Sequence, residues 1–160
     1  MPRIIVGMAD LRITRSPDIL ATIGLGSCVG IAMYDPTTKI AGLAHIMLPE
    51  SINGANEQNP AKFADTAVTK MLNDMEKMGA MRRRIWAKIV GGAQMFNFGS
   101  TNDNLRVGDR NIRAVKNALN AEHIPIKGDE TGGTFGRTME VDAEDGKVLI
   151  KAIDQENRYI

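Results

Sequence analysis

The sequence predicts a single layered α/β domain, a sandwich of mixed, largely antiparallel sheets with two main helices. The chain has 160 residues, which suits one domain with one hydrophobic core. Short apolar, β-prone runs recur along it with turn signals between them, and two longer segments have helical periodicity. There is no internal repeat and no domain boundary. Residues 1–160 are therefore expected to form one unit, with residues 152–160 as a loose polar tail.

Strands are expected where apolar and β-branched residues form short runs that end at turn-forming residues. The runs span residues 4–6, 19–23, 28–34, 40–47, 85–90, 124–127, 139–141 and 148–150. The runs 28–34 and 40–47 are apolar on both faces, which predicts a buried hairpin covered on each side. Pro36 favours a turn over the intervening residues 35–39 because its ring fixes φ.

Two helices are expected because apolar residues recur three and four positions apart. The first is predicted to begin at Asn59 and Pro60, since Asn caps helices and Pro is favoured at their first position, and to end at Gly79. Its apolar stripe contains Phe63, Ala64, Ala67, Val68, Met71, Leu72, Met75 and Met78. The second helix is predicted to begin at Asp109. Its core-facing residues are expected to be Ile112, Val115 and Leu119.

The composition excludes several classes of protein. Hydrophobic residues make up 43% and charged residues 24% of the chain, values that are normal for a globular protein and argue against global disorder. The formal net charge is only +1, so we expect no nucleic-acid partner, which would require a large basic surface. The one dense basic run, Arg82–Arg84, is interpreted as a solvated segment after a helix, with a docking role as the alternative.

The cellular location is expected to be the cytoplasm. There is one cysteine, so no intrachain disulfide can form, which fits a reducing compartment. No apolar run approaches the ~20 residues that span a bilayer, and the first residues lack the pattern of a secretory signal, so no membrane insertion is expected. We expect no metal site, because one Cys and the two residues His45 and His123 cannot complete a zinc shell without several carboxylates.

Cys28 is the main candidate for chemistry. It follows Gly26 and Ser27, and a loop of small residues leaves backbone N–H groups free to bind an oxyanion. If residues 28–34 and 40–47 pair about the turn, Cys28 lies opposite His45 or its immediate neighbour. A free thiol with a pKa near ~8.5 is mostly protonated at neutral pH, and an adjacent imidazole can take its proton and later return one to a leaving group.

Thr22 is a candidate for the third group that often orients such an imidazole, because its hydroxyl can accept from a ring N–H. Each residue also has an ordinary structural interpretation. A lone cysteine is usually a small buried hydrophobe, a lone histidine on an apolar strand is usually a core residue, and Thr22 is a typical strand residue. Residue type and spacing alone leave both interpretations open.

Taken together, these residues and several Gly-rich stretches resemble the chemoreceptor glutamine deamidase family, CheD. The resemblance runs from about Met8 to about Ala152. Each matching stretch is weak alone, but their order and spacing are specific. The stretches are LGSCV at 25–29, YD at 34–35, GLAH at 42–45, LP at 48–49, GGA at 91–93, MF at 95–96, GDRN at 108–111, and the segment 129–137 with its Gly-Gly and Gly-Arg pairs.

The resemblance implies a three-layer α/β fold related to bacterial toxins that deamidate glutamine. It implies that Cys28 attacks the side-chain carboxamide of receptor glutamines to form a thioester, with His45 as base and then acid and Thr22 orienting it, and with no cofactor. Two partners are implied: the long cytoplasmic coiled coil of a chemoreceptor and a CheC-type phosphatase. Methylesterase activity through the same thioester is an implied second reaction.

A further hypothesis concerns partner binding. We expect the loops 91–99 and 129–137 to border the active cleft, with Phe96 or Phe98 as an apolar anchor and with Gly132 and Gly133 allowing close approach. The alternative is that both phenylalanines are core residues. Two other functions also stay open: a non-catalytic binding module for a phosphatase and receptors, and a cysteine amidohydrolase that acts on a small molecule or a peptide bond.

Overall fold

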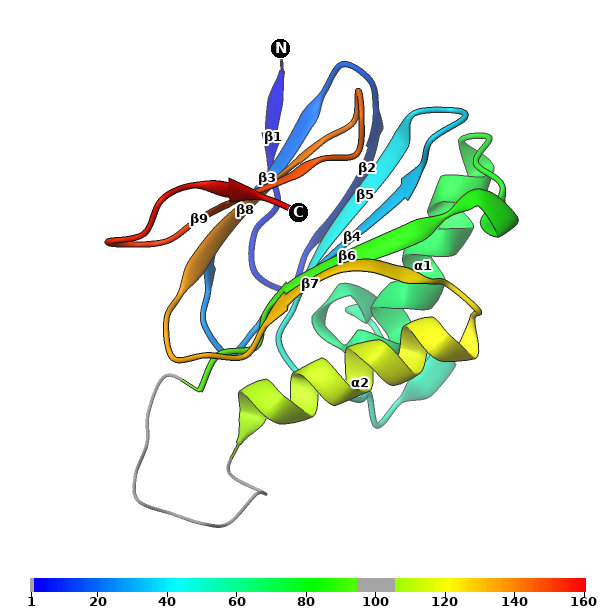
Figure 1. Cartoon of the computed structure of the whole chain (residues 1–160). Helices are drawn as coiled ribbons and strands as arrows, with labels where there is room; N and C mark the ends of the chain where they lie inside the picture. The colour runs from blue at the N-terminus through cyan, green and yellow to red at the C-terminus, as the bar shows by residue number, and fades with distance from the viewer. Residues whose placement is uncertain (1, 95–105) are drawn as a thin grey trace.

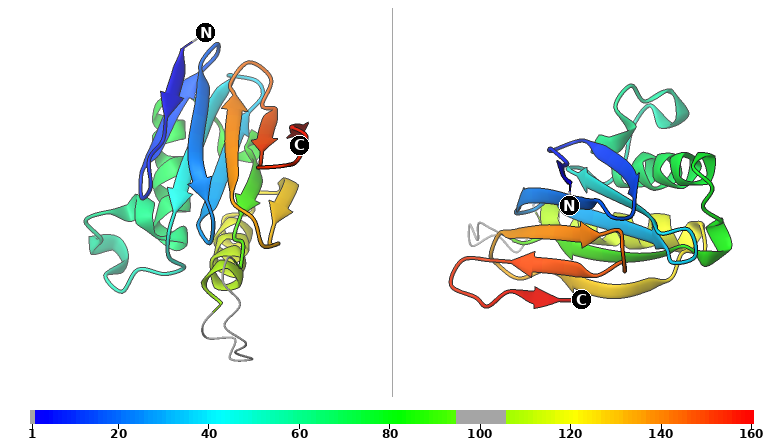
Figure 2. Two further views of the ribbon diagram at one scale, coloured as in Figure 1. Left: turned by 90° about the vertical axis from the view of Figure 1, so that its left-hand side faces the viewer. Right: turned by 90° about the horizontal axis from the view of Figure 1, so that it is seen from above.

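The computed structural model describes residues 2–94 and 106–160 as three layers (Figure 1). Two β-sheets pack face to face, and two α-helices cover the outside of one of them. Figure 2 shows both helices on the same side of the sheets. The predicted layered α/β class, with mixed and largely antiparallel sheets, is confirmed. The implied relation to glutamine-deamidating toxins stays a prediction.

We name the sheet without helices the outer sheet and the helix-covered one the central sheet. The outer sheet has the order β1 (Arg3–Ile5), β3 (Ile19–Leu25), β8 (Arg137–Asp142), β9 (Val148–Lys151) and β10 (Arg158–Tyr159). The central sheet has the order β2 (Leu11–Arg15), β5 (Ile40–Ile46), β4 (Val29–Asp35), β6 (Trp86–Gly91) and β7 (Ile126–Thr131). β1 is parallel to β3 and β7 to β6, and the other neighbouring pairs are antiparallel.

The hairpin of β4 and β5 lies in the middle of the molecule and is buried along its whole length, as predicted. Its side chains alternate between the two faces of the central sheet. Those that pack under the helices are Val29, Ile31, Met33, Ile40, Ala44 and Ile46. Those that face the outer sheet include Ala32, Tyr34, Ala41 and Leu43. By this alternation His45 also faces the outer sheet, between two layers that exclude water.

The first helix, α1 (Ala64–Lys77), buries the predicted stripe but begins later than expected. Residues Pro60–Lys62 form a 3-10 turn, and Asn59 makes no side-chain cap. The cause is a tertiary contact: the carbonyl of Lys62 accepts hydrogen bonds from the N–H groups of Met47 and Leu48, and Phe63 forms a β-bridge with Leu48. The segment before α1 is therefore held by backbone hydrogen bonds to the residues that follow β5.

The end of the chain differs from the prediction of a loose tail. Arg158 and Tyr159 form β10 against β9, and Ile160 exchanges two backbone hydrogen bonds with Val148. Arg158 also pairs with the carboxylate of Glu130 on β7. The prediction is wrong for these last three residues, because sheet pairing is decided by an available edge rather than by local hydrophobicity. The preceding residues are exposed, with Ile153 at 89%.

β2 was also missing from the prediction. Its sequence, Leu-Arg-Ile-Thr-Arg, alternates apolar and charged residues and pairs with β5 at the edge of the central sheet. Only one of its faces packs against the core, so the strand needs no continuous apolar run.

The second helix, α2 (Val107–Ala121), begins two residues before the predicted Asp109. Val115 and Leu119 are fully buried and Ile112 packs against the same core, as predicted. Asn111 is also buried in this stripe, which the apolar pattern did not predict.

Candidate active site

Cys28 lies in the short connection between β3 and β4, directly before the first residue of β4. The N–H of Ala93 donates to the carbonyl of Gly26, and the N–H of Gly92 donates to that of Cys28, each at 2.8 Å. Gly91 permits this approach: a Cβ there would lie 2.4 Å from the Cys28 oxygen, and its φ of +109° is rare for other residues. These backbone hydrogen bonds hold the predicted loop of small residues in place.

The register of the hairpin differs from the prediction by one or two residues. His45 lies opposite Gly30, so the ladder, continued by one step, places Cys28 opposite Met47 rather than His45 or its neighbour. The reason is that Asp35, assigned to the turn, is the last residue of β4 and pairs with the first residue of β5. Cys28 and His45 become diagonal neighbours on one face, a relation that separates Cα atoms by about 7–8 Å.

Both side chains belong to the face between the sheets. Cys28 is half-buried and packs against the apolar cluster that the two sheets share, and His45 is fully buried on the same face. The structure therefore brings the predicted nucleophile and base to the same end of the same hairpin, through a diagonal pairing.

Thr22 lies on β3 of the outer sheet and contacts His45 across the space between the sheets. Its hydroxyl oxygen is 2.7 Å from His45 Nδ1, and the hydroxyl donates to the carbonyl of Val6 at 2.6 Å. A hydroxyl has one proton, so toward Nδ1 it can only accept. His45 must therefore have its proton on Nδ1, which leaves a lone pair on Nε2. Among the described residues, no group forms a hydrogen bond with this buried Nε2.

The two titratable groups favour their uncharged forms. Burial lowers the pKa of His45, so the imidazole is neutral at physiological pH. Burial also raises the pKa of the Cys28 thiol, an effect that the residue's own backbone N–H opposes by hydrogen bonding to the sulfur. The resting pair is therefore a thiol and a neutral imidazole that is able to accept a proton at Nε2.

Asn111, on α2, belongs to the GDRN stretch of the family resemblance, but the sequence analysis assigned it no role in the site. It is fully buried, and its side-chain nitrogen donates to the carbonyls of Ser27 at 2.9 Å and Met47 at 3.0 Å. It thereby connects the residue before Cys28 to the end of the strand that holds His45. The available signal was a polar amide at a core-facing position of an otherwise apolar stripe.

The Gly-rich segment after β7 packs against the segment that follows β6. Gly132 donates to the carbonyl of Gly91 at 2.9 Å, and Gln94 donates to that of Gly133 at 2.9 Å. Both glycines have positive φ, which favours glycine there. They thus support the backbone that holds the Cys28 loop, and their predicted role in partner binding stays a prediction. Phe96 and Phe98 lie outside the described residues.

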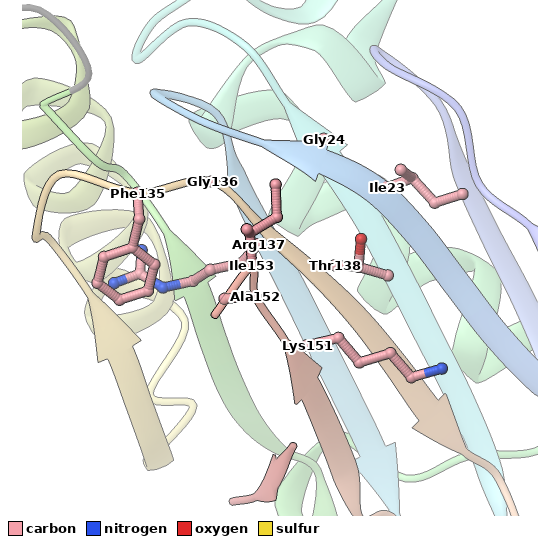
Figure 3. A pocket seen from close by; sticks show the side chains of 9 residues that line it. All are labelled: Ile23, Gly24, Phe135, Gly136, Arg137, Thr138, Lys151, Ala152 and Ile153. Atoms are coloured by element: carbon pink, nitrogen blue, oxygen red, sulfur yellow. The ribbon is translucent and has the colours of Figure 1, made fainter. Parts of the chain in front are cut away.

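An open groove of about 540 Å³ lies at one end of β3, β8 and β9, and none of the three predicted catalytic residues lines it (Figure 3). In it the Arg137 guanidinium lies 4.2 Å from the centre of the Phe135 ring. Arg137 is otherwise buried, forms an ion pair with Glu130 at 2.9 Å and donates to the carbonyls of Gly91 and Gly132, so its contacts connect β7 to the loops near Cys28. The lining residues are Ile23, Gly24, Phe135, Gly136, Arg137, Thr138, Lys151, Ala152 and Ile153.

In residues 2–94 and 106–160, no group of three or more His, Cys, Asp and Glu side chains is arranged to hold a metal ion. No helix in these segments has the length and apolar character needed to cross a membrane.

Comparison with known proteins identifies the family. Residues 47–152 match the family model described as CheD chemotactic sensory transduction. The "Chemoreceptor glutamine deamidase CheD" of Halalkalibacterium halodurans is 47% identical, over 97% of this chain and 96% of the relative. Two proteins named "Probable chemoreceptor glutamine deamidase CheD", from Lachnoclostridium phytofermentans and Caldanaerobacter subterraneus, are 48% and 49% identical over the same shares of both chains.

Among solved structures, the hypothetical protein YfiH of Bacillus licheniformis aligns with a TM-score of 0.48 and 18% identity, over 76% of this chain and 50% of that one. The Neisseria meningitidis protein NMB0706 aligns with a TM-score of 0.49 and 10% identity, over 83% of this chain and 63% of that one. Because the family model covers residues 47–152 and the relatives match nearly the whole chain at 47–49% identity, we conclude that this chain belongs to the CheD family.

Proposed function

We propose that this chain deamidates glutamine side chains of chemoreceptors, with Cys28 as nucleophile, His45 as acid and base, and Thr22 as the residue that orients His45. The reaction is that of a protein-glutamine glutaminase. The names of relatives at 47–49% identity support the activity and the substrate class. The hydrogen bond of 2.7 Å between Thr22 Oγ1 and His45 Nδ1 is the observation that carries the mechanism.

The tautomer of His45 determines which ring nitrogen accepts the thiol proton in the first step. Because Nδ1–H is held by Thr22, Nε2 is available to take the thiol proton as the Cys28 sulfur attacks the glutamine carboxamide carbon. The S–C bond forms, and the carbonyl π electrons move to its oxygen. Backbone N–H groups of the Cys28 loop are suited to stabilise this oxyanion.

The tetrahedral intermediate collapses when its C–N bond breaks. His45 returns the proton from Nε2 to the leaving nitrogen, so ammonia departs and a thioester remains on Cys28. A water molecule then gives a proton to Nε2 and adds to the thioester carbon. The C–S bond breaks, the sulfur regains the proton, and the glutamine has become glutamate. No step requires a metal or an organic cofactor.

The uncharged resting pair affects reactivity. Since burial disfavours both the thiolate and the imidazolium, proton transfer is expected to accompany attack rather than precede it. Hydrolysis of receptor methyl esters would use the same thioester, with methanol rather than ammonia as the leaving group.

The partners follow from the substrate class. We propose that the glutamines modified by this enzyme lie on the cytoplasmic helices of chemoreceptors and that the chain acts in the cytoplasm. A CheC-type phosphatase is the second proposed partner, and competition between the two for one surface would couple deamidation to signalling. We propose that the segment with Gly132 and Gly133, which forms backbone hydrogen bonds with Gly91 and Gln94, borders this surface.

Intact-mass analysis tests the proposal. A glutamine-bearing cytoplasmic fragment of a chemoreceptor is incubated with the protein and separately with Cys28→Ala. We expect a gain of about one dalton per modified site, with ammonia released, and no change with the variant. Asn117→Ala, an exposed change on α2, is the matched control and should act like the wild type.

Each other outcome favours one of the alternatives. Binding of the receptor fragment without any mass change would support the non-catalytic binding module. Rapid alkylation of Cys28 by iodoacetamide, dependent on His45 but accompanied by no receptor deamidation, would support a different cysteine amidohydrolase.

A further inference from the structure

Asn111 links two backbone segments that are far apart in the sequence. Its side-chain nitrogen has two protons, and both are used: one hydrogen bond goes to the carbonyl of Ser27 at 2.9 Å and the other to the carbonyl of Met47 at 3.0 Å. Ser27 directly precedes Cys28, and Met47 lies two residues after His45. One buried amide thus joins the nucleophile loop to the strand of the base.

This amide lies where the backbone ladder ends. The last paired residues of β4 and β5 are Val29 and Ile46, and the N–H of Met47 turns away to bond the carbonyl of Lys62. The next step of the ladder therefore lacks backbone pairing. At this position the side-chain NH₂ group of Asn111 donates to one carbonyl on each side of the ladder, and these two hydrogen bonds replace the missing backbone hydrogen bonds.

The chemistry of the contact specifies an asparagine. Two carbonyl oxygens face the side chain, so the NH₂ group must point toward them and Oδ1 away from them. Within the described part of the chain, Oδ1 is buried and has no hydrogen-bond partner. A buried acceptor without a partner is unfavourable for stability, so packing alone does not explain this residue. An aspartate of the same shape would place a carboxylate against two carbonyls.

The peptide that Asn111 holds contains the N–H of Cys28. A trans peptide is planar, and its C=O and N–H point in opposite directions. Fixing the Ser27 oxygen on Asn111 therefore aims the Cys28 N–H away from α2. That N–H belongs to the same residue as the attacking sulfur, and a donor beside the nucleophile can reach the oxygen of the carbonyl that the sulfur attacks.

We propose that Asn111 is a positioning residue that orients the Ser27–Cys28 peptide, so that the Cys28 N–H donates to the oxyanion formed when the sulfur attacks a carbonyl. The assignment rests on the proposed role of Cys28 as nucleophile. Neighbouring contacts help: the carbonyls of Gly26 and Cys28 are held by Ala93 and Gly92, so Asn111 holds the one carbonyl between them.

Two reagents separate this role from general stability. p-Nitrophenyl acetate acylates the sulfur: the S–C bond forms through an oxyanion, the C–O bond breaks, p-nitrophenolate leaves and the thiol proton goes to His45. Iodoacetamide alkylates the sulfur: the S–C bond forms, the C–I bond breaks, iodide leaves, the thiol proton goes to His45 and no oxyanion forms. Only the first reaction depends on an aligned oxyanion donor. Both rates are measured on Asn111→Ala and Asn111→Asp, at a temperature at which each variant is folded by circular dichroism.

We expect acylation to fall about 10²-fold in both variants, since a displacement of about 1 Å has an effect of this size, while alkylation changes by less than about threefold. Val115→Ala, which removes buried contacts on the same helix, should leave the ratio of the two rates unchanged. Asn117→Ala, an exposed asparagine on this helix, should change neither rate. If only one Asn111 variant folds, its ratio of acylation to alkylation rates tests the proposal alone.

An acylation-to-alkylation ratio within twofold of wild type in the Asn111 variants would overturn the positioning role and leave the proposed function intact. Equal losses in both reactions, as in a destabilised protein, would overturn it as well. A wild-type Cys28 that reacts with neither reagent would overturn both the proposed function and this assignment.

Discussion

Each end of the β4–β5 hairpin contains one buried titratable side chain, and the two side chains differ in how fully they are hydrogen-bonded. At the closed end, Asp35 is fully buried and its carboxylate is saturated with donors. At the open end, His45 is fully buried and its Nε2 has no hydrogen-bond partner in residues 2–94 and 106–160. Both residues belong to the same pair of strands, so burial alone does not distinguish them. The difference lies in what the surrounding chain offers to each group.

The closed end contributes to stability. Arg84 forms a bidentate pair with Asp35, with two N···O distances of 2.9 Å, and the N–H groups of Thr37 and Met81 donate to the same carboxylate. Burial alone would raise the pKa of Asp35, but these donors outweigh it and lower the pKa to about 2. A buried charge with this many donors is stabilising, and removal of a partner is strongly unfavourable.

The open end lacks such compensation. Burial lowers the pKa of His45, and no charged group in the described part of the chain opposes this effect. Native proteins satisfy most buried polar atoms, so an acceptor left without a partner points to a function that needs it free. A buried polar atom without a hydrogen-bond partner therefore indicates the functional site better than burial or polarity alone. Variants at the two ends should therefore separate activity from stability.

The largest effect is expected from His45→Gln. The amide retains a polar side chain but cannot act as acid and base, so the rate of deamidation should fall about 10³-fold. The unfolding free energy should fall by only about 1–2 kcal/mol, since the amide can retain a hydrogen bond to Thr22 but keeps a buried polar atom without a partner, as His45 does. Deamidation is measured by mass change on a receptor fragment and stability by urea unfolding. A rate within tenfold of wild type would contradict the proposed base.

Asp35→Asn should do the opposite: it should lower stability and leave activity unchanged. We expect a loss of about 2–3 kcal/mol of unfolding free energy at pH 7, because the folded state holds the pKa of Asp35 at about 2 against an ordinary 3.8. The rate per folded molecule should match that of wild type. The lowered pKa makes this stability present above pH 3.8 and progressively lost as pH falls to about 2, so the two proteins should converge in acid. A constant difference from pH 7 to pH 2 would contradict this.

Thr22→Val should lower the deamidation rate about tenfold. It keeps the shape of the side chain but removes the hydroxyl that fixes the proton of His45 on Nδ1. Val6 and His45 would lose a partner, which should lower the unfolding free energy by about 1–2 kcal/mol. Thr22→Ser, which retains the hydroxyl, is the control and should keep both the rate and most of the stability. Equal losses in both variants would indicate packing rather than orientation.

The smallest effect is expected in the pH dependence of stability near neutrality. The folded state lowers the pKa of His45, so below its ordinary value of 6.5 the unfolded chain binds more protons than the folded one. Stability is present above pH 6.5 and falls with decreasing pH, by up to about 1.4 kcal/mol per pH unit, until the lowered pKa is reached. His45→Gln should lack this slope. Identical slopes in the two proteins from pH 7 to pH 5 would show that His45 titrates normally.

Much of the fold was predictable because strong local patterns decided it. The apolar runs of β4 and β5, the stripe of α1 and the stop at Gly79 formed as expected. The elements that were missed depend on partners distant in the sequence. β10 exists because β9 has a free edge, and α1 starts late because the segment before it pairs with the end of β5.

In the candidate site, too, some features were predictable from local sequence and others depend on distant residues. Cys28, His45 and Thr22 were recognisable as candidates from residue type, small neighbours and family motifs. Their arrangement was not. The register differs from the prediction because Asp35, which the sequence pattern assigned to the turn, is the last residue of β4 and pairs with Ile40. Asn111 was overlooked because an asparagine in a helix gives no sign of which carbonyls its side chain will reach.

The sequence by itself determined the layered α/β class, the central buried hairpin, the family and the identity of the thiol and the imidazole, because these depend on composition, periodicity and short motifs. Only the tertiary structure decided that His45 is protonated on Nδ1, that its Nε2 is left without a partner in the described residues, and that Asn111 joins the Cys28 loop to β5. These features depend on hydrogen bonds between groups that are 16 to 84 residues apart, which local sequence does not encode.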